Sequence, residues 1–277
     1  MSFLEKIILF LQGTMVTPTA YGWFHIMWIF ITLLAVIFLS KIGDKNNEKQ
    51  TKAILLTYGV IALILELLKQ IIWSFNYDPI TNLVTWNYEW YSFPFQLCTT
   101  PIYVSIICPF VKNKKTKEAL LSYMAFITIL GSIATIIMPD SCFVEDILVN
   151  IHTMWLHCGS FAVSIYLLIS NVVAVNIENL KKAIITFLVF VVIALTLNIF
   201  IYNIGILEGE TFNMFFISPY FESTLPVFNI IYKYVPYIIF LIIYICIIEL
   251  GAVLVYLMSL LIKKMIHKIN NKKIKAS

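Results

Sequence analysis

The sequence contains no arginine and few charged residues of any kind. All 19 of its basic residues are lysines, and charged residues make up only 12% of the 277 positions. Soluble domains carry about 25% charged residues, so this scarcity excludes an ordinary water-soluble enzyme. Without arginine the chain also lacks the planar guanidinium that clamps phosphates and bases. The net charge of +4 therefore does not indicate a nucleic-acid partner.

Cysteine is scarce as well. The five cysteines show neither metal-site spacing nor a Cys-x-x-Cys motif; they are Cys98, Cys108, Cys142, Cys158 and Cys246. We therefore expect no disulfide framework, no metal and no diffusible cofactor. The sequence also has no low-complexity tract, and with charges this sparse that excludes a disordered chain.

Hydrophobic residues are abundant instead. They make up 61% of the sequence and raise its mean hydropathy to +0.91. Seven apolar stretches are long enough to cross about 30 Å of hydrocarbon as helices. They cover residues 22–40, 53–73, 93–111, 119–138, 149–170, 183–203 and 235–262. Several are apolar on both faces, which favours helices over the alternating strands of a barrel. The predicted fold is all-α: a polytopic membrane bundle of seven transmembrane helices.

The chain divides into three predicted regions. Residues 1–20 have a hydrophobic core too short for a signal peptide, so we expect them to lie at the membrane interface. Residues 21–262 form the seven-helix transmembrane domain. Residues 263–277 form a basic cytoplasmic tail.

Prolines are expected to mark the limits of several spans. Pro94 should open the third span, Pro139 should close the fourth and Pro236 should open the seventh. Pro101 and Pro109 fall inside the third span and are expected to bend it.

The distribution of lysine predicts the orientation of the bundle. Sixteen of the 19 lysines lie after spans one, three and five or in the tail. Lysine-rich connections stay on the cytoplasmic side. The opposite side has only Lys6 and Lys233, together with acidic residues such as Asp140 and Glu210. The sequence therefore predicts an outside N-terminus and a cytoplasmic C-terminus.

Polar residues inside the spans are the candidate site. Ionisable groups are costly in hydrocarbon, so each is by default a functional candidate. Glu66, Lys69 and Gln70 share one helix face, where the first two can pair. The other candidates are Gln96, Cys98, His152, His157 and Asn198. All of them fall in the outer half of the bundle, which indicates a pocket open to the outer leaflet or the outer aqueous face.

Cysteine and histidine together indicate nucleophilic chemistry. Histidine can take the proton of a thiol and later return it, and a nearby carboxylate can orient the imidazole. His152 and His157 point about 140° apart around their helix, so both cannot face one narrow pocket. We prefer His157, the deeper of the two. A thiolate of Cys98 at this depth would meet lipid ester bonds, which predicts acyl transfer through a thioester.

Each of these features also has a structural explanation. A cysteine in a membrane helix is most often a small buried hydrophobe, and His157 alone can bond a neighbouring helix. Glu66 and Lys69 can be an ion pair that fixes helix packing. Two other functions therefore stay open: a small-solute binding protein or permease, and a non-catalytic structural or regulatory subunit.

Several motifs resemble a known family. Phe93-Pro94-Phe95-Gln96-Leu97-Cys98 resembles the Leu-Pro-Leu-His-Leu-Cys motif of the YwaF-like bacterial integral membrane proteins. Leu156-His157 followed by Tyr166 is similar to their Ser-His-Gly segment with its later tyrosine. Met138-Pro139-Asp140 resembles their Thr-Pro-Asp, and Thr211-Phe212-Asn213-Met214 is a looser match to their Gly-Thr-Asn-Tyr-Met motif.

The resemblance implies a function. The family is similar to an animal transmembrane acyltransferase that moves polyunsaturated acyl chains onto ether lysophospholipids. It implies a protein of the bacterial cytoplasmic membrane that acts on membrane phospholipids, with Cys98 as nucleophile and His157 as acid–base. Gln96 replaces the histidine of the family motif and is a candidate oxyanion donor. The residues expected to support the pocket are Glu66, Lys69, Gln70, Gln96 and Asn198.

Overall fold

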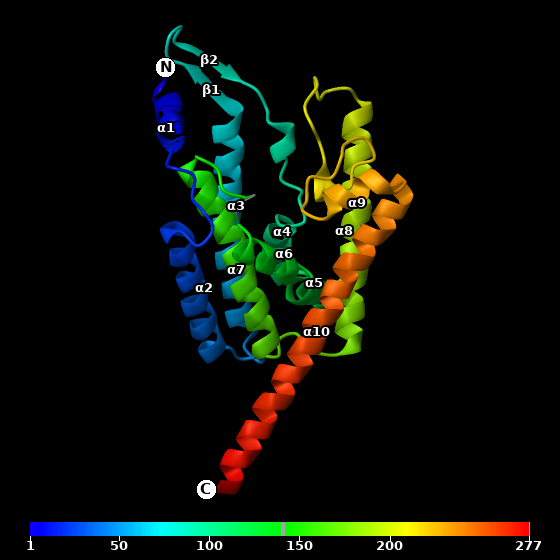
Figure 1. The fold of residues 1–277 in the computed structure, drawn as a ribbon. Helices are drawn as coiled ribbons and strands as arrows, with labels where there is room; N and C mark the ends of the chain where they lie inside the picture. The colour runs from blue at the N-terminus through cyan, green and yellow to red at the C-terminus, as the bar shows by residue number, and fades with distance from the viewer. Residues whose placement is uncertain (140–141, 277) are drawn as a thin grey trace.

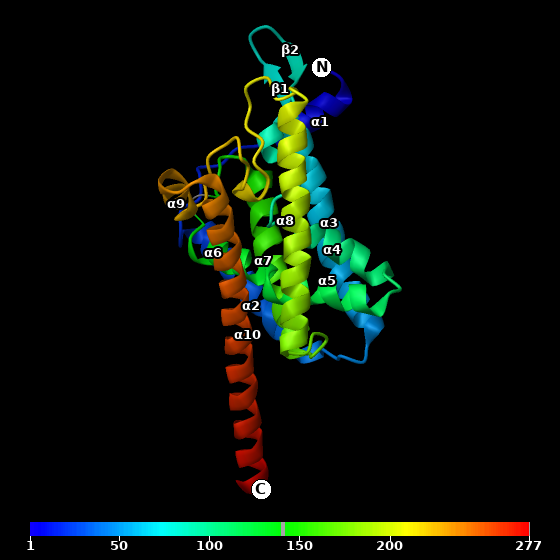
Figure 2. The ribbon, with the colours of Figure 1, turned by 90° about the vertical axis from the view of Figure 1, so that its right-hand side faces the viewer.

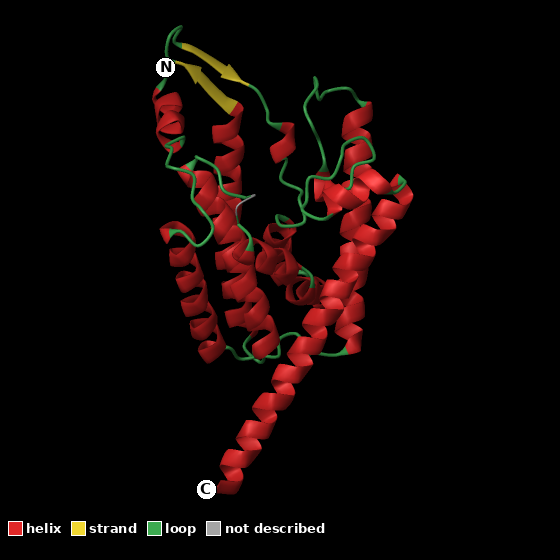
Figure 3. Cartoon of the chain, viewed as in Figure 1, coloured by secondary structure: helices red, strands yellow, loops and turns green. Residues whose placement is uncertain are grey.

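The computed structural model describes residues 1–139 and 142–276, and it describes their side chains except at 267 and 269–276. The described residues form helices and the connections between them, with a single two-stranded hairpin as the exception (Figure 3). The main feature of the predicted class, a helical chain, is therefore confirmed.

Six helices in the described part are long and apolar enough to cross a membrane. They form a bundle whose axes mostly run from one end to the other (Figure 1, Figure 2). They match six of the seven predicted spans, so the chain is a multi-pass membrane protein by helix length and hydropathy. The six are α2 (Trp23–Ile42), α3 (Glu48–Ser74), α5 with α6 (Lys114–Phe126 and Thr128–Ile137), α7 (Ile147–Ile169), α8 (Ile177–Asn203) and α10 (Tyr237–Ala276).

The third predicted span, residues 93–111, is wrong as a full-length helix. Its helical part is α4 (Thr100–Ile107) continued by the 3-10 turn η2 (Cys108–Phe110). Eleven residues rise only about 16 Å, roughly half of the hydrocarbon. Pro101 does not bend a long helix; it lies in the first turn of α4, where a missing N–H costs nothing. Residues 93–99 are not helical.

Local sequence explains where the other helices begin and end. Asn47, Asn113 and Asn176 precede α3, α5 and α8, and each side chain accepts a backbone N–H three residues further on. Such caps satisfy N–H groups that a helix leaves open. As predicted, α6 ends before Pro139 and α10 begins directly after Pro236.

The lysine-rich connections gather at one end of the bundle. Lys117 lies 3.8 Å from Glu48, and Lys182 lies 2.7 Å from Glu118, so the starts of α3, α5 and α8 are neighbours. The ammonium of Lys52 lies 4.4 Å from the centre of the Phe110 ring, at the end of η2. This is the arrangement that the lysine count predicts for one side of the membrane; which side it is stays a prediction.

The opposite end carries the irregular structure. It holds the hairpin of β1 (Phe75–Asp78) and β2 (Leu83–Trp86), helix α1 (Phe3–Leu11) and the 3-10 turn η1 (Trp90–Ser92). It also holds the connection from α8 to α10, which contains η3 (Met214–Phe216) and α9 (Phe228–Tyr234). The two strands pair antiparallel, with Phe75 opposite Trp86. We call this the hairpin end, and the other the lysine end.

The core lies around α5, α6 and α7, and the outer helices surround it. In the windows that can span a membrane, 61% of the α5–α6 residues and 67% of the α7 residues are buried, against 17% in α2. The largest fully buried side chains in the main core come from α5, α7, α8, α10 and the α8–α10 connection: Tyr123, Phe126, Tyr166, Phe187, Phe212, Phe215, Phe240 and Tyr244. Helix α2 is therefore a peripheral helix.

The two terminal regions differ in their structure. Residues 1–20 include α1, whose Ile8 packs against Ile72 and Phe75 at the hairpin end. Gln12 donates to the backbone carbonyls of the same two residues. The predicted tail, residues 263–277, does not separate from the last span, because α10 continues as one helix through residue 276 and extends beyond the bundle (Figure 1).

Candidate functional site

The third apolar segment is interrupted at residues 93–99, which are not helical and which we call the break. The backbone of the break therefore lies inside the bundle without the regular hydrogen bonds of a helix. In a membrane, non-helical backbone is tolerated where it is buried in protein or lines a cavity. Side chains provide hydrogen bonds to backbone carbonyls within the break and directly before it. Gln70 donates to the carbonyl of Ser92 over 2.6 Å, and Tyr103 donates to the carbonyl of Pro94. Thr99 and Thr100 donate back to the carbonyls of Gln96 and Leu97. These side-chain hydrogen bonds hold the break in one conformation up to Cys98 and Thr99, directly before α4.

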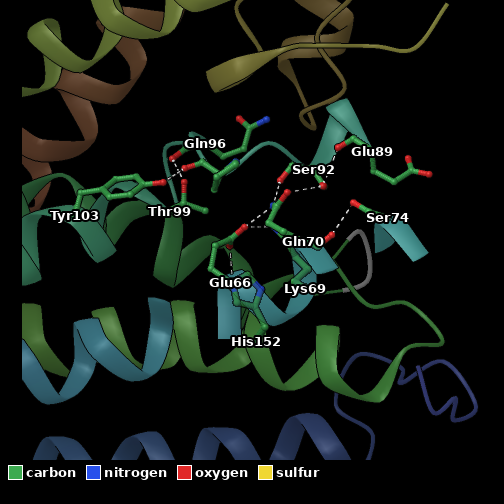
Figure 4. Close-up of polar contacts among 11 residues, drawn as sticks. Glu66, Lys69, Gln70, Ser74, Glu89, Ser92, Gln96, Thr99, Tyr103 and His152 are labelled. Carbon is green, nitrogen blue, oxygen red and sulfur yellow. Dashed lines mark hydrogen bonds and ion pairs between the residues drawn. The ribbon is translucent and has the colours of Figure 1, made fainter. Parts of the chain in front are cut away.

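Glu66 is the centre of a buried polar group beside this break (Figure 4). Its side chain is only 2% exposed. One oxygen lies 2.8 Å from the ammonium of Lys69 and the other lies 2.8 Å from Nε2 of His152, which comes from α7. Gln70 donates to Glu66 over 2.7 Å. We call Glu66, Lys69, Gln70, Ser92 and His152 the Glu66 cluster.

Gln70 links the Glu66 cluster to the hairpin end. Its amide binds Glu66 and the Ser92 carbonyl, and the Ser92 hydroxyl donates to the carbonyl of Glu89 over 2.8 Å. Burial, and then the charge of the Glu210 carboxylate, raise the pKa of Glu89. The carboxyl of Glu89 therefore takes up a proton more readily than a fully exposed one would.

Gln96 and Asn198 hold the α8–α10 connection and do not belong to the Glu66 cluster. Gln96 donates to the carbonyl of Asn213 and accepts from the N–H of Phe215, over 3.0 and 2.8 Å. Asn198 donates to the carbonyl of Met214 and accepts its N–H, over 3.0 and 2.7 Å. Phe215 has a φ of 59°, which bulky side chains rarely adopt. These two amides therefore fix a strained turn, which we call the η3 turn.

Cys98 lies near the C-terminal end of the break, two residues before α4 begins. Its side chain is partly exposed and packs against the main core. Lys69 and Glu66 are near enough to act on it electrostatically. Burial is the largest effect on the thiol and disfavours the thiolate, and the Glu66 carboxylate disfavours it as well, whereas the Lys69 ammonium and the dipole of α4 act in the opposite direction.

His157 faces a different neighbour from His152. Its Nε2 lies 3.5 Å from the hydroxyl of Thr135 on α6. This contact continues a row of hydroxyl bonds between the same two helices, in which Ser132 and Ser160 approach to 2.6 Å. Over the residues that the structure describes, no hydrogen bond joins Cys98 to His157. The helical spacing correctly predicts that the two histidines point apart.

The sequence gives His152 less weight than His157, and it does not indicate Tyr58. His152 was set aside in favour of His157, yet it is the histidine that the carboxylate of Glu66 contacts. Tyr58 of α3 belongs to the core cluster against which Cys98 packs, and its hydroxyl donates to the carbonyl of Leu156 over 3.1 Å. A tyrosine in an apolar stretch gives no signal by itself, because tyrosines are common at the membrane interface.

The match to a known family covers this whole arrangement. The profile of the TMEM164 family matches residues 20–260. The chain belongs to the TMEM164 family. The part that matches the TMEM164 profile contains the Glu66 cluster, Cys98, His157 and the η3 turn, so none of them lies in a region peculiar to this chain. No curated protein and no solved structure matches the chain. The family match does not test the likeness to the YwaF-like bacterial proteins, which remains a resemblance of motifs. Asp140, which belongs to one of those motifs, lies outside the described residues.

Proposed function

We propose that this TMEM164-family chain is a membrane acyltransferase or lipid hydrolase that carries an acyl group on Cys98. The observation behind the proposal is the position of Cys98 on a break in an apolar segment, two residues before the N-terminus of α4. A purely packing cysteine needs none of these features. The motif around Cys98, which resembles that of the YwaF-like proteins, supports the same interpretation.

The proposed reaction has two balanced halves. In the first, the sulfur of Cys98 attacks the carbonyl carbon of a lipid ester. The ester C–O bond breaks, and the thiol proton leaves with the lysolipid as its hydroxyl hydrogen. In the second, the hydroxyl of an acceptor lysolipid, or water, attacks the thioester and returns the proton to the sulfur. Transfer and hydrolysis differ only in that acceptor.

Proton transfer is proposed for His157 on the resemblance alone, because in the structure its Nε2 contacts Thr135 and not Cys98. A positioned imidazole contributes about 10²- to 10⁴-fold to such a step. The Glu66–His152 pair is the competing candidate, since Nε2 of His152 lies 2.8 Å from a carboxylate oxygen of Glu66 and a catalytic triad also pairs an imidazole with a carboxylate. Gln96 retains one amide N–H besides the one that holds Asn213, so it remains the candidate oxyanion donor.

Turnover by the purified full chain tests the proposal. The protein is incorporated into phosphatidylcholine vesicles containing an isotope-labelled lysophospholipid, and both the labelled diacyl product and free fatty acid are measured. Cys98→Ala should reduce both to the level of empty vesicles. Cys246→Ala is the matched control, because Cys246 is an exposed cysteine on α10. Equal turnover in wild type and Cys98→Ala would refute the proposal and favour a structural role.

A further inference from the structure

A groove separates two helices that follow each other in the chain. Helices α2 and α3 are joined by a short connection, and such antiparallel neighbours usually pack directly together. Here α2 packs along α7 at the edge of the bundle (Figure 1). A cavity of about 330 Å³ remains between α2, α3 and α7. In a bilayer an empty groove of this size is unfavourable, because its walls lose dispersion contacts.

The walls of the groove offer almost nothing to a polar ligand. Most of the side chains are aliphatic or aromatic, including Ile31, Ala35, Leu39, Ile54, Ala162 and Val163. Three polar atoms in the wall are bonded within the protein. Tyr58 donates to Leu156, Trp155 donates to the Tyr58 carbonyl, and Thr32 donates to the Trp28 carbonyl. The occupant that fits such a wall is a hydrocarbon chain.

The groove is long and runs along the helices. Its wall on α2 extends from Trp28 to Ile42, which corresponds to about 21 Å along the axis. One leaflet of hydrocarbon is about 15 Å thick. The groove therefore accommodates an extended chain that enters from the bilayer, and Ala53 and Thr57 on its α3 side are exposed to lipid.

One wall residue connects the groove to Cys98. Tyr58 lines the groove and belongs to the core cluster against which Cys98 packs. Gly159 lets this ring lie against α7, because a Cβ there would come within 2.8 Å of the Tyr58 ring.

We propose that the α2–α3–α7 groove binds one acyl chain of a membrane phospholipid. The assignment of that chain as the one transferred rests on the proposed function; the binding itself does not. The volume of the groove then limits which chains the protein accepts.

Photocrosslinking tests the binding without requiring turnover. The full chain carrying Cys98→Ala is incorporated into nanodiscs that contain a phosphatidylcholine with a diazirine near the end of one acyl chain. After irradiation, adducts are located by mass spectrometry. We expect them to concentrate on groove residues such as Ala35 and Ala162, relative to lipid-facing Val192 on α8.

Filling the groove provides the matched comparison. Ala35→Trp should lower the adducts on Ala162 and the other groove residues roughly tenfold, because the indole takes up the space that the chain would occupy. Thr57→Trp is a second variant on another wall, in case the first does not fold. Leu33→Trp is the control, because Leu33 lies on α2 but faces lipid outside the groove.

The outcomes separate this inference from the proposed function. Adducts in the groove that both filling variants remove, and Leu33→Trp leaves, support the groove even if wild type shows no turnover. Adducts spread evenly over the lipid-facing helices overturn it even if turnover is normal. Crosslinks between two protein copies through the same residues, without lipid, also overturn it.

Discussion

At the residue scale, the buried charges all depend on Glu66. It is the single carboxylate that contacts both Lys69 and His152 in the described structure. Removing one partner of a buried pair leaves the other charge uncompensated. The ion pair between Glu66 and Lys69 therefore supports the local fold as well as the electrostatics around Cys98.

Removing Glu66 alone should destabilise the protein more than removing both charges. We expect Glu66→Leu to lower the free energy of unfolding by about 3–5 kcal/mol, and Glu66→Leu with Lys69→Leu to restore much of it, because no unpaired ammonium remains. Unfolding in detergent at one fixed pH measures both variants. A double variant less stable than the single one would contradict this account.

The two histidines should separate in their effects. His157→Gln should lower turnover by about 10²- to 10⁴-fold with little change in stability, as expected for a lost acid–base group. His152→Gln should mainly lower thermal stability, since it leaves one oxygen of Glu66 without its partner. Turnover and unfolding of the same preparations are compared. If His152→Gln abolished turnover in a folded protein and His157→Gln did not, the Glu66–His152 pair would be the base.

The sequence predicted part of this site because some of it is local. Glu66 and Lys69 are three residues apart on one helix, so their pairing follows from helix geometry. The contact of His152 with Glu66 joins residues of α3 and α7. Helical spacing shows that His152 and His157 point apart, but it does not show which neighbouring helix each one meets. That choice depends on how the helices pack.

At the element scale, the third apolar segment and the η3 turn form one unit. Hydropathy predicted a full span for residues 93–111, because the open stretch before α4 is as apolar as a helix. The hydrogen bonds that stabilise the open stretch join residues that are distant in sequence. Gln70 donates to the carbonyl of Ser92, and Gln96 bonds the backbone of the η3 turn. A hydropathy window does not detect such bonds.

Releasing the η3 turn should loosen that end of the bundle. Asn198→Ala removes two bonds to the backbone of Met214 and should cost about 1–3 kcal/mol, because buried backbone groups lose their partner. Hydrogen exchange at the amides of 213–218 should become faster, while Thr196→Ala, which changes an exposed threonine on the same helix, should leave them unchanged. Unchanged exchange in Asn198→Ala would show that the η3 turn keeps its conformation without the Asn198 side chain.

At the scale of the whole molecule, the two ends of the bundle differ in charge and in structure. Lysine-rich connections meet at one end, and the hairpin with the η3 turn lies at the other. The Glu66 cluster and Cys98 lie toward the hairpin end, because Gln70 binds Ser92 there. The positive-inside rule then predicts that the proposed site lies in the outer half of the membrane.

Labelling of single cysteines tests this orientation. In a variant without native cysteines, Asn82→Cys in the hairpin should react with a membrane-impermeant maleimide in intact cells. Asn46→Cys, between α2 and α3, should react only after permeabilisation. Both positions are exposed, so access alone does not separate them. Labelling of Asn46→Cys in intact cells would show that the orientation is the opposite of the predicted one.

The most direct test of the central claim is the mass of the protein itself. Wild-type protein incubated with phosphatidylcholine, without an acceptor, should gain the mass of one acyl chain on Cys98, and hydroxylamine should remove it because a thioester is labile to that reagent. Cys98→Ala should gain nothing, and Cys246→Ala should behave as wild type. Turnover by a wild-type protein that never carries an acyl group on Cys98 would contradict the account.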